Sequence, residues 1–444
     1  MALASSPTFN LTPTPEPVVL PTNYISTFDF SDVELPDTYK ENFEIYGNRT
    51  IASFLRAASA ELPTSSDLIK WTEEGRLHTL YTGLTRSGNV ITKAAHNFRL
   101  NQTVIISDGT VIQKGIITDV ATGTFTVSPF SGATLTGATT GLSVYVYGSE
   151  FKKGTNGMQG SLEAVPSFHE TNPIIIKDKY EVAGSDMTQI GLVEVSTEGG
   201  GSGYLWYLKS HHETRLRFDD YLEMSMVEGV PAETGAALDA GYKGTKGLFY
   251  EIGQRGNVFN GVMSAKADFD SVLKRLDKQG SVMENMFFAD RDQNLAIDDF
   301  LATQNGLGDG GTSYGAFNND KNMALNLGFK GFNRGSYEFY KTDWKYLNDA
   351  STRGSIEGTG KVRAVIVPSG TKTVYDQLLG SKIRQPFLHV KYRKSATEDR
   401  KYKSWLTGSA GGASNDDLDA MQVHFLSERA LVVIGANNFV LVQD

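Results

Sequence analysis

Proline is concentrated at the N-terminal end of this chain. Seven of the 13 prolines fall within residues 1–65. Proline fixes the backbone angle φ and has no N–H to donate, so a stretch so rich in it cannot form a regular helix or a central strand. Residues 1–65 are therefore not expected to form a regular helix or sheet.

The same stretch carries apolar side chains at short intervals, which disordered segments usually lack. They include Val18, Leu20, Tyr24, Phe28, Phe30, Phe43 and Tyr46. Eight acidic residues oppose three basic ones across residues 1–65. We predict an extended N-terminal arm over 1–65 that lies across another surface, either of its own chain or of a neighbour.

Helical spacing follows at the end of this arm. Ile51, Phe54, Leu55, Ala58 and Leu62 repeat at the period of a helix, with Thr50 as N-cap and Pro63 as the stop. A second short helix is predicted from about residue 67 to residue 74.

Residues 86–150 differ in composition from the rest of the chain. Only seven of these 65 residues are charged, while Thr and Gly dominate. Short runs of alternating apolar and polar residues, such as 103–107, 124–127 and 142–147, are separated by turn signals. We predict a small all-β domain of about six strands, inserted into a chain of different composition.

The remainder mixes helical and strand patterns. An extended hairpin or loop over 151–198 and a flexible joint at Gly199–Gly203 lead into the longest predicted helix, 204–228. Later elements are helices at 267–279 and 291–304, a strand at 362–367, a helix near 371–379, and C-terminal strands that turn through 435–438. The predicted fold class is α+β.

Composition excludes several kinds of chemistry. The 444 residues include no Cys, which rules out disulfides, thiolate metal sites and a thiol nucleophile. No run of about 18 apolar residues is present, so no membrane partner is expected. The N-terminal residues lack the basic and apolar regions of a secretory signal, and Asn10, Asn48 and Asn101 are interpreted as chance glycosylation motifs. A net charge of −9 disfavours tight DNA binding by a basic surface.

Four local patterns could carry chemistry, and each has a stronger structural interpretation. The adjacent His211 and His212 point about 100° apart on a helix and cannot chelate one metal. The glycines of 306–311 follow a helix rather than a strand, so the phosphate-binding context is absent. Asp298 and Asp299 diverge on a helix and are assigned to its solvated side. The basic stretches 391–394 and 400–403 are interpreted as a solvated strand and loop or as a contact to an acidic neighbour. We assign no catalytic, cofactor-binding or metal-binding residue.

The order of these parts resembles the major capsid proteins of tailed double-stranded DNA bacteriophages, which share the HK97-like fold. Three stretches are further similar to the capsid proteins of crAss-like phages: Trp71–His78, Asn285–Leu301 and Glu428–Val442. The resemblance in the order of parts covers nearly the whole chain, whereas the three stretches are short.

The resemblance implies a division of the chain. Residues 1–65 would be the N-terminal arm, 66–85 with 151–198 the extended loop, and 86–150 an inserted β domain. A peripheral domain would comprise 199–285 and 421–444, with 204–228 as its spine helix, and 286–420 would be the axial domain.

The resemblance also implies partners. The chain would form hexamers and pentamers of an icosahedral shell, with portal, scaffolding and auxiliary capsid proteins. It would enclose double-stranded DNA without sequence-specific binding, in a virion assembled in the host bacterial cytoplasm. Only about 50 residues precede the first predicted helix, which leaves no room for a long scaffolding segment. We expect that scaffolding is a separate protein or that the scaffolding segment is absent from this chain. Lys152 and Lys153 lie in the expected loop, but no motif assigns them a crosslink.

Two other functions remain open. A carbohydrate-active hydrolase with an accessory β domain would need two carboxylates that face each other across a cleft. A virion surface or fibre protein would show internal repeats, and no repeat period is found in the sequence.

Overall fold

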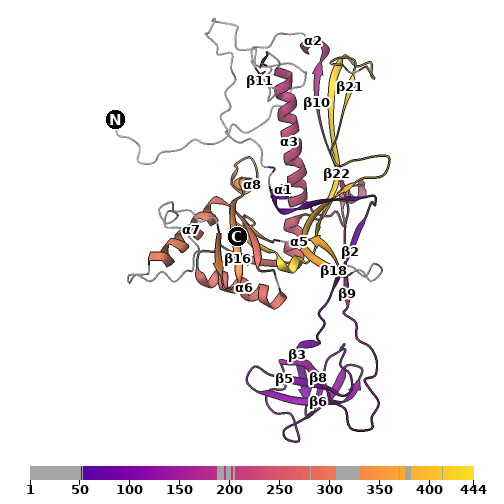
Figure 1. The fold of residues 1–444 in the computed structure, drawn as a ribbon, viewed down its shortest axis with the longest axis vertical. Coiled ribbons are helices and arrows are strands. Elements are labelled where there is room, and N and C mark those ends of the chain that lie inside the picture. The colour runs from indigo at the N-terminus through magenta and orange to yellow at the C-terminus, as the bar shows by residue number, and fades with distance from the viewer. Residues whose placement is uncertain are drawn as a thin grey trace. The chain divides into compact units, whose positions relative to one another are not determined.

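The computed structural model describes residue 52 and residues 54–187, 195–196, 202–203, 206–280, 282–306, 331–369, 371–375, 382–412 and 414–444. The predicted arm up to residue 51 therefore lies outside the described residues, as does most of the Gly199–Gly203 joint. The chain divides into two compact units, one of residues 1–69 and 170–444 and the other of residues 70–169. Helices and strands occur together, which confirms the α+β class (Figure 1).

Six strands of the unit 70–169 close into a barrel in the order β3-β4-β7-β6-β5-β8 (Figure 1). Their bounds are Leu80–Ser87, Val90–Thr92, Thr124–Pro129, Ile112–Ala121, Gln102–Ser107 and Leu142–Ser149. Because successive side chains of a strand face opposite sides, alternate residues fill the barrel: Val104, Ile117, Val127 and Val144 have no exposed surface. The first strand begins at Leu80, whereas the sequence pattern placed the start of this domain at residue 86.

Strands β2, Ile69–Glu74, and β9, Pro166–Thr171, pair with each other. The predicted helix over 67–74 is therefore wrong. Buried and exposed residues alternate along β2 with a period of two, and Trp71 lies 5.8 Å from His169 between ring centroids. Pairing with β9, almost 100 residues later in the chain, decides the structure of this stretch.

A five-stranded sheet lies in the other unit. The strand β22, Ala420–Val433, pairs over residues 420–429 with β10, Ile174–Ala183, and with two shorter strands on its other edge. These are β20, Leu388–Arg393, and β21, Lys403–Gly408. Strand β1, Ala60–Thr64, adds to β20 in parallel.

The first predicted helix is shorter than expected, because α1 spans only Phe54–Ala58. Leu62 and Pro63 belong to β1 instead, so Pro63 does not stop a helix. A proline is tolerated there because β1 is an edge strand and needs no N–H on its open side.

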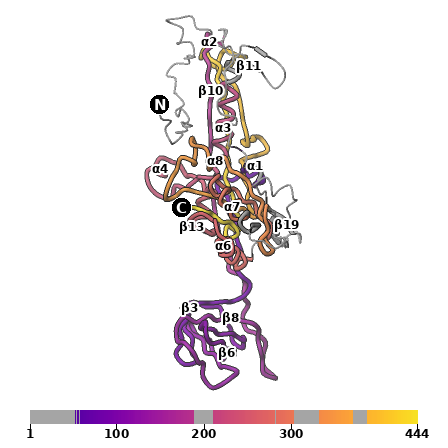
Figure 2. Tube along the Cα trace, turned by 90° about the vertical axis from the view of Figure 1, so that its left-hand side faces the viewer, coloured from indigo at the N-terminus to yellow at the C-terminus, as the bar shows by residue number. Residues whose placement is uncertain are grey.

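The longest helix is α3, Trp206–Glu228, which confirms the helix predicted over 204–228. Figures 1 and 2 both show it running alongside β10 and β22. Phe218, Leu222 and Met226 are buried and repeat every four residues, and the Phe218 ring stacks on Phe425 of β22 at 5.6 Å. Tyr221, which precedes Leu222 on this helix, is 40% exposed.

A six-stranded sheet has the order β13-β23-β17-β14-β16-β15. Its strands span Asn257–Asn260, Val440–Gln443, Val362–Pro368, Glu284–Ala289, Tyr337–Asp343 and Gly331–Arg334. Along β17 the residues Val365 and Val367 enter one buried cluster, while Ala364 and Ile366 enter another. Both faces of this strand are therefore covered, which explains its continuous apolar sequence.

Two helices cover one face of this sheet. Helix α6, Lys266–Gln279, buries Phe269, Val272 and Leu276 and ends at Gly280 with φ 69°, as the sequence predicted. Helix α7, Arg291–Gly306, buries Ile297 and Leu301 in the same cluster.

The C-terminal strands do not form a hairpin, which corrects the predicted turn through 435–438. Strand β22 belongs to the five-stranded sheet and β23 to the six-stranded sheet. Gly435, with φ 63°, and the 3-10 turn η3, Ala436–Asn438, redirect the chain between them. The expected boundaries placed 421–444 with 199–285, whereas β23 pairs with β17 and β13, and β20 and β21 pair with β22.

The predicted helix near 371–379 is also wrong, because β18, Thr371–Tyr375, pairs with β19, Lys382–Pro386. The β-branched residues of β18 favour a strand. The remaining short elements are α2 Gly184–Met187, β11 Val195–Ser196, β12 Ser202–Gly203, α4 Ala236–Asp239, α5 Leu248–Arg255, α8 Lys345–Asn348 and the 3-10 turn η2 Arg353–Ser355.

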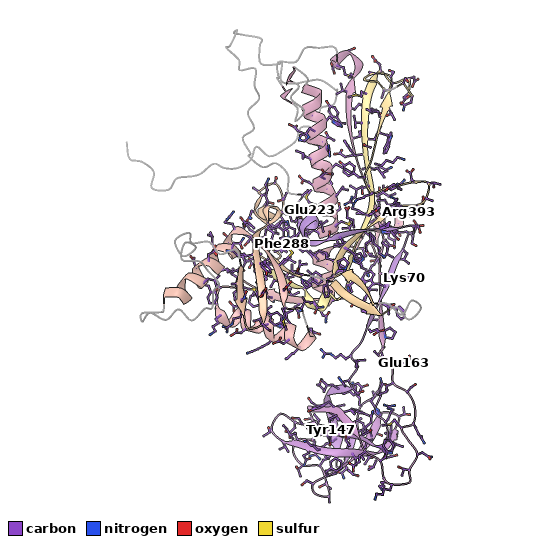
Figure 3. All side chains as sticks on the ribbon, viewed as in Figure 1. Lys70, Tyr147, Glu163, Glu223, Phe288 and Arg393 are labelled. Carbon is purple, nitrogen blue, oxygen red and sulfur yellow. The ribbon has the colours of Figure 1, made fainter. Side chains whose placement is uncertain are left out.

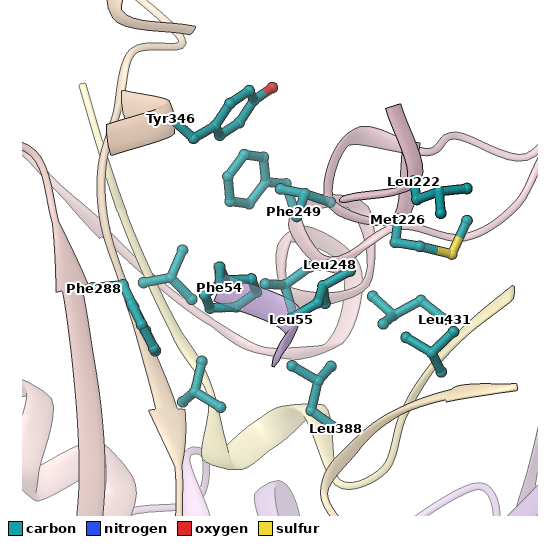
Figure 4. Close-up of a cluster of buried hydrophobic side chains, with 14 of the residues drawn as sticks. Phe54, Leu55, Leu222, Met226, Leu248, Phe249, Phe288, Tyr346, Leu388 and Leu431 are labelled. Atoms are coloured by element: carbon teal, nitrogen blue, oxygen red, sulfur yellow. The ribbon is translucent and has the colours of Figure 1, made fainter. Parts of the chain in front are cut away.

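The largest buried cluster joins both sheets of the unit to α1, α3 and α5 (Figure 4). Phe54 of α1 lies 4.4 Å from Trp344 and 4.6 Å from Phe288 between ring centroids, and is 1% exposed. Helix α1 is thus part of the core.

His389 of β20 is buried inside the five-stranded sheet, at 1% exposure. Burial lowers its pKa to about 4, partly offset by the carbonyl of Pro386 at 3.2 Å from Nδ1. The lowered pKa means that the folded state resists protonation. Stability is therefore full above about pH 6.5 and is lost as the pH falls from there to about 4.

We expect the His389→Asn variant to lose this part of the pH dependence. In the wild type the free energy of unfolding should fall by about 3 kcal/mol between pH 7 and pH 4 through this group alone. Denaturant unfolding at a series of pH values measures it. The matched control is His78→Asn, at an exposed position. Equal pH dependence in wild type and His389→Asn would contradict the assignment.

Candidate functional site

The backbone at the start of α1 is held by carboxylates of α3. Asp220 accepts a hydrogen bond from the backbone N–H of Ala52 at 3.0 Å. Glu223 accepts from Phe54 at 3.1 Å and from Leu55 at 3.4 Å. The first N–H groups of a helix have no partner within the helix, so these two carboxylates cap α1 from outside. Glu223 is 6% exposed, which makes its loss costly.

A cavity of about 590 Å³ lies beside this anchor. Arg429, 7% exposed, projects into it and donates to Ser427 Oγ at 2.9 Å and to the carbonyl of Lys401 at 3.1 Å. Burial lowers the pKa of Arg429, and the neighbouring Tyr402 has a pKa raised to about 12 by its burial and by Asp219. The cavity is mixed in charge, since Glu61 and Asp219 line it together with Lys401 and Arg429.

The Glu223→Ala variant is expected to weaken the anchor by about 1–2 kcal/mol, because two N–H groups of α1 lose their acceptor. Trypsin cleavage at Arg56, within α1, should become faster as the first turn opens more often. Limited proteolysis followed by mass spectrometry measures this rate. Glu163→Ala, which removes an exposed carboxylate from the other unit, is the control. Unchanged cleavage at Arg56 would show that Glu223 is not the cap.

The basic stretches 391–394 and 400–403 meet acidic side chains of their own chain. Arg393 lies 3.2 Å and Arg400 2.6 Å from Glu428. The other pairs are Arg393 with Asp67, Lys401 with Glu61, Lys394 with Asp399 and Lys403 with Glu398. The acidic neighbour that the sequence suggested is therefore within this chain, and the stretch does not form an unbalanced positive surface.

The other residues that the sequence singled out do not come together. His211 stacks on Phe425 of β22 at 5.7 Å, and burial lowers its pKa. Asp298 forms an ion pair with Lys341 and is 15% exposed, so its assignment to the solvated face was wrong. Asp299 is exposed, as expected. Of the glycine-rich stretch only Gly306, the last residue of α7, is described.

The ribbon of β2 and β9 and its continuation toward the barrel expose large apolar side chains. Leu77 is 87% exposed, Phe168 77% and Val165 67%, and the N–H of Gly75 bonds to the carbonyl of Val165 at 3.1 Å. Side chains of this size that are so exposed make this stretch a candidate site of interaction. The sequence did not predict this surface, because its only sign there is isolated apolar residues between turn signals in an extended stretch.

In the described part of the chain, no group of three or more His, Asp or Glu side chains could hold a metal ion. None of the helices described has the length and apolar composition required to cross a membrane.

No protein-family model matches this chain, and no curated protein matches it. Among solved structures it is similar to the mature capsid of bacteriophage PhiM1, with 8% identity, coverage of 93% of this chain and 92% of that chain, and a TM-score of 0.41. It is similar to the capsid of cyanophage P-SCSP1u, with 8% identity, 93% coverage of both chains and a TM-score of 0.40. The capsid of an empty GTA particle gives 6% identity, coverage of 92% and 94%, and a TM-score of 0.40.

Proposed function

We propose that this chain is the major capsid protein of a tailed double-stranded DNA bacteriophage with the HK97-like fold, most similar to those of crAss-like phages. It assembles into hexamers and pentamers of an icosahedral shell and has no enzymatic role. The observation that carries the proposal is the attachment of α1. This helix follows an acidic sequence rich in aromatic residues, it is buried in the core, and carboxylates of α3 cap its first N–H groups.

The physical reason is the use of surface. An obligate interface buries about 2,000–5,000 Å². An arm and an exposed apolar ribbon add contact area without enlarging the core. This suits a capsid subunit that must contact many neighbouring copies. In this proposal residues 1–65 are the arm and the ribbon belongs to the extended loop. Helix α3 is the spine of the peripheral domain, and the sheet containing β14–β17 is the axial domain.

The proposed partners follow from the shell. They are further copies of the chain, a portal, scaffolding proteins and auxiliary capsid proteins, in a virion assembled in the host bacterial cytoplasm. The shell encloses DNA without reading its sequence. The pairing of 391–394 and 400–403 with acids of the same chain supports this, since phosphate binding requires unbalanced positive charge.

Direct imaging tests the proposal. Purified chain, examined by size-exclusion chromatography and negative-stain electron microscopy, should give closed shells, hexamers or pentamers. A stable monomer that hydrolyses a polysaccharide would favour the carbohydrate-active hydrolase. Elongated particles without closed shells would favour a surface or fibre protein. Either result would overturn the capsid proposal.

A further inference from the structure

The outer face of the barrel carries a row of apolar side chains across its strands. Leu80 of β3 is directly opposite Tyr145 of β8, which is opposite Ile105 of β5, and Ile105 is opposite Lys114 of β6. Leu80 is 51% exposed and Tyr145 42%. Side chains directly opposite on neighbouring strands share a face, so this row is one continuous surface.

Tyr147 extends the surface along β8. Tyr147 (Figure 3) is 48% exposed and lines the same surface hollow as Tyr145, and Lys114 Nζ lies 5.9 Å from its ring centroid. The row and Tyr147 are not part of the barrel core. That core includes the neighbouring residues Val144 and Val104. A small barrel gains no stability from exposing two tyrosines, so another molecule is the natural cover for them.

A groove of about 680 Å³ runs beside these tyrosines. Leu77, Met158 and Leu162 supply its other large apolar side chains. The polar part of its lining includes Arg76, His78 and Arg99. Among the described residues 54–187, no carboxylate lines this groove. The nearest chemical match is an occupant with aromatic or aliphatic side chains and acidic residues between them.

The charge of the chain points to one such occupant. Residues 70–169 contain eight basic and six acidic residues, in a chain of net charge −9. Residues 16–46 contain seven acidic residues and one basic residue, with Tyr24, Phe28, Phe30, Phe43 and Tyr46 among them. This segment has both properties that the groove requires.

We propose that this groove binds the acidic, aromatic segment 16–46 of a second copy of the chain. Aromatic side chains of the segment pack on Tyr145, Tyr147 and Leu77, and its carboxylates lie near Arg76 and Arg99. Exposed charge pairs contribute little individually, so each contact is weak and gains strength from repetition across many copies. Binding also places the inserted barrel among the contacts between copies.

Photocrosslinking in the full chain tests this proposal. Tyr147 is replaced by the photoreactive residue p-benzoylphenylalanine, and this chain is co-expressed with a second copy carrying Asp29→Glu, which changes the peptide mass and keeps the charge. Illumination should join position 147 to peptides from 16–46 that carry the Asp29→Glu mass. The same replacement at Phe130, 52% exposed and outside the groove lining, is the matched control and should not give these products.

A charge reversal gives the second measurement. Arg76→Glu should reduce the crosslink yield roughly two- to five-fold, while Lys153→Glu, which reverses a charge outside the groove lining, should not. Crosslinks to any other segment, crosslinks only to the same copy, equal yields from positions 147 and 130, or no product would each overturn the proposal. The products are scored whether or not the copies close into shells, so failure here is distinguishable from failure of the capsid function.

Discussion

A chain that lacks residues 1–49 is expected to fold and to form no closed shells. Among the described residues, α1 keeps its capping by Asp220 and Glu223 and Phe54 keeps its place in the core, because these contacts involve no residue of the deleted segment. The apolar residues from Val18 to Tyr46 are removed, and with them the contact area that we assign to neighbouring copies. The expected change is a loss of particles by electron microscopy, with a thermal midpoint within a few degrees of the wild type.

Deletion of residues 1–15 alone is the matched control for this experiment. These residues contain no charged side chain and precede the run of apolar residues that starts at Val18. The shorter deletion should therefore leave shell yield near the wild-type value. Normal shells from the chain without 1–49 would refute the role of the arm. Failure of both chains to assemble would place the effect in the first 15 residues instead.

Phe54→Ala is expected to lower the free energy of unfolding by about 3–5 kcal/mol. Phe54 is 1% exposed and lies between Trp344 and Phe288, so alanine leaves a cavity that three elements would have to collapse to fill. The same substitution loosens the point where the arm joins the core. Guanidinium unfolding followed by tryptophan fluorescence measures the loss, because Trp344 is in direct contact.

Phe130→Ala removes the same side chain from an exposed position, 52% accessible, on the barrel. Its effect should be within about 0.5 kcal/mol, as for most surface substitutions. If the two variants are equally stable, Phe54 does not anchor α1 in the core. If Phe54→Ala strongly lowers the free energy of unfolding but shell yield stays normal, the packing of α1 stabilises the fold without being required for assembly.

Patterns within single elements were predicted well where they were long and regular. Helix α6 and its ending at Gly280 follow from Phe269, Val272 and Leu276, and the continuous apolar run of β17 reflects burial on both faces. The errors occurred at short stretches. Residues 69–74 and 371–375 are strands because each pairs with a partner strand. Leu62 lies in β1 rather than in a helix because β1 pairs with β20.

The candidate site was predictable only in part. The density of aromatics among prolines indicated an arm, and the low charge of 86–150 indicated a separate β domain. The capping of α1 by Asp220 and Glu223 had no local signal, since the partners are more than 160 residues apart. The exposed row on β8 likewise depends on which strands are neighbours in the barrel.

The amino-acid sequence by itself determined the α+β class, the helical period of α3 and α6, and the absence of thiol chemistry. Only the tertiary structure decided that β22 and β23 enter different sheets and that Glu428, Glu61 and Asp67 pair with the basic stretches of the same chain. The reason is physical. A period in the sequence reports which side of one element is buried, whereas pairing depends on groups that meet only after distant segments have folded together.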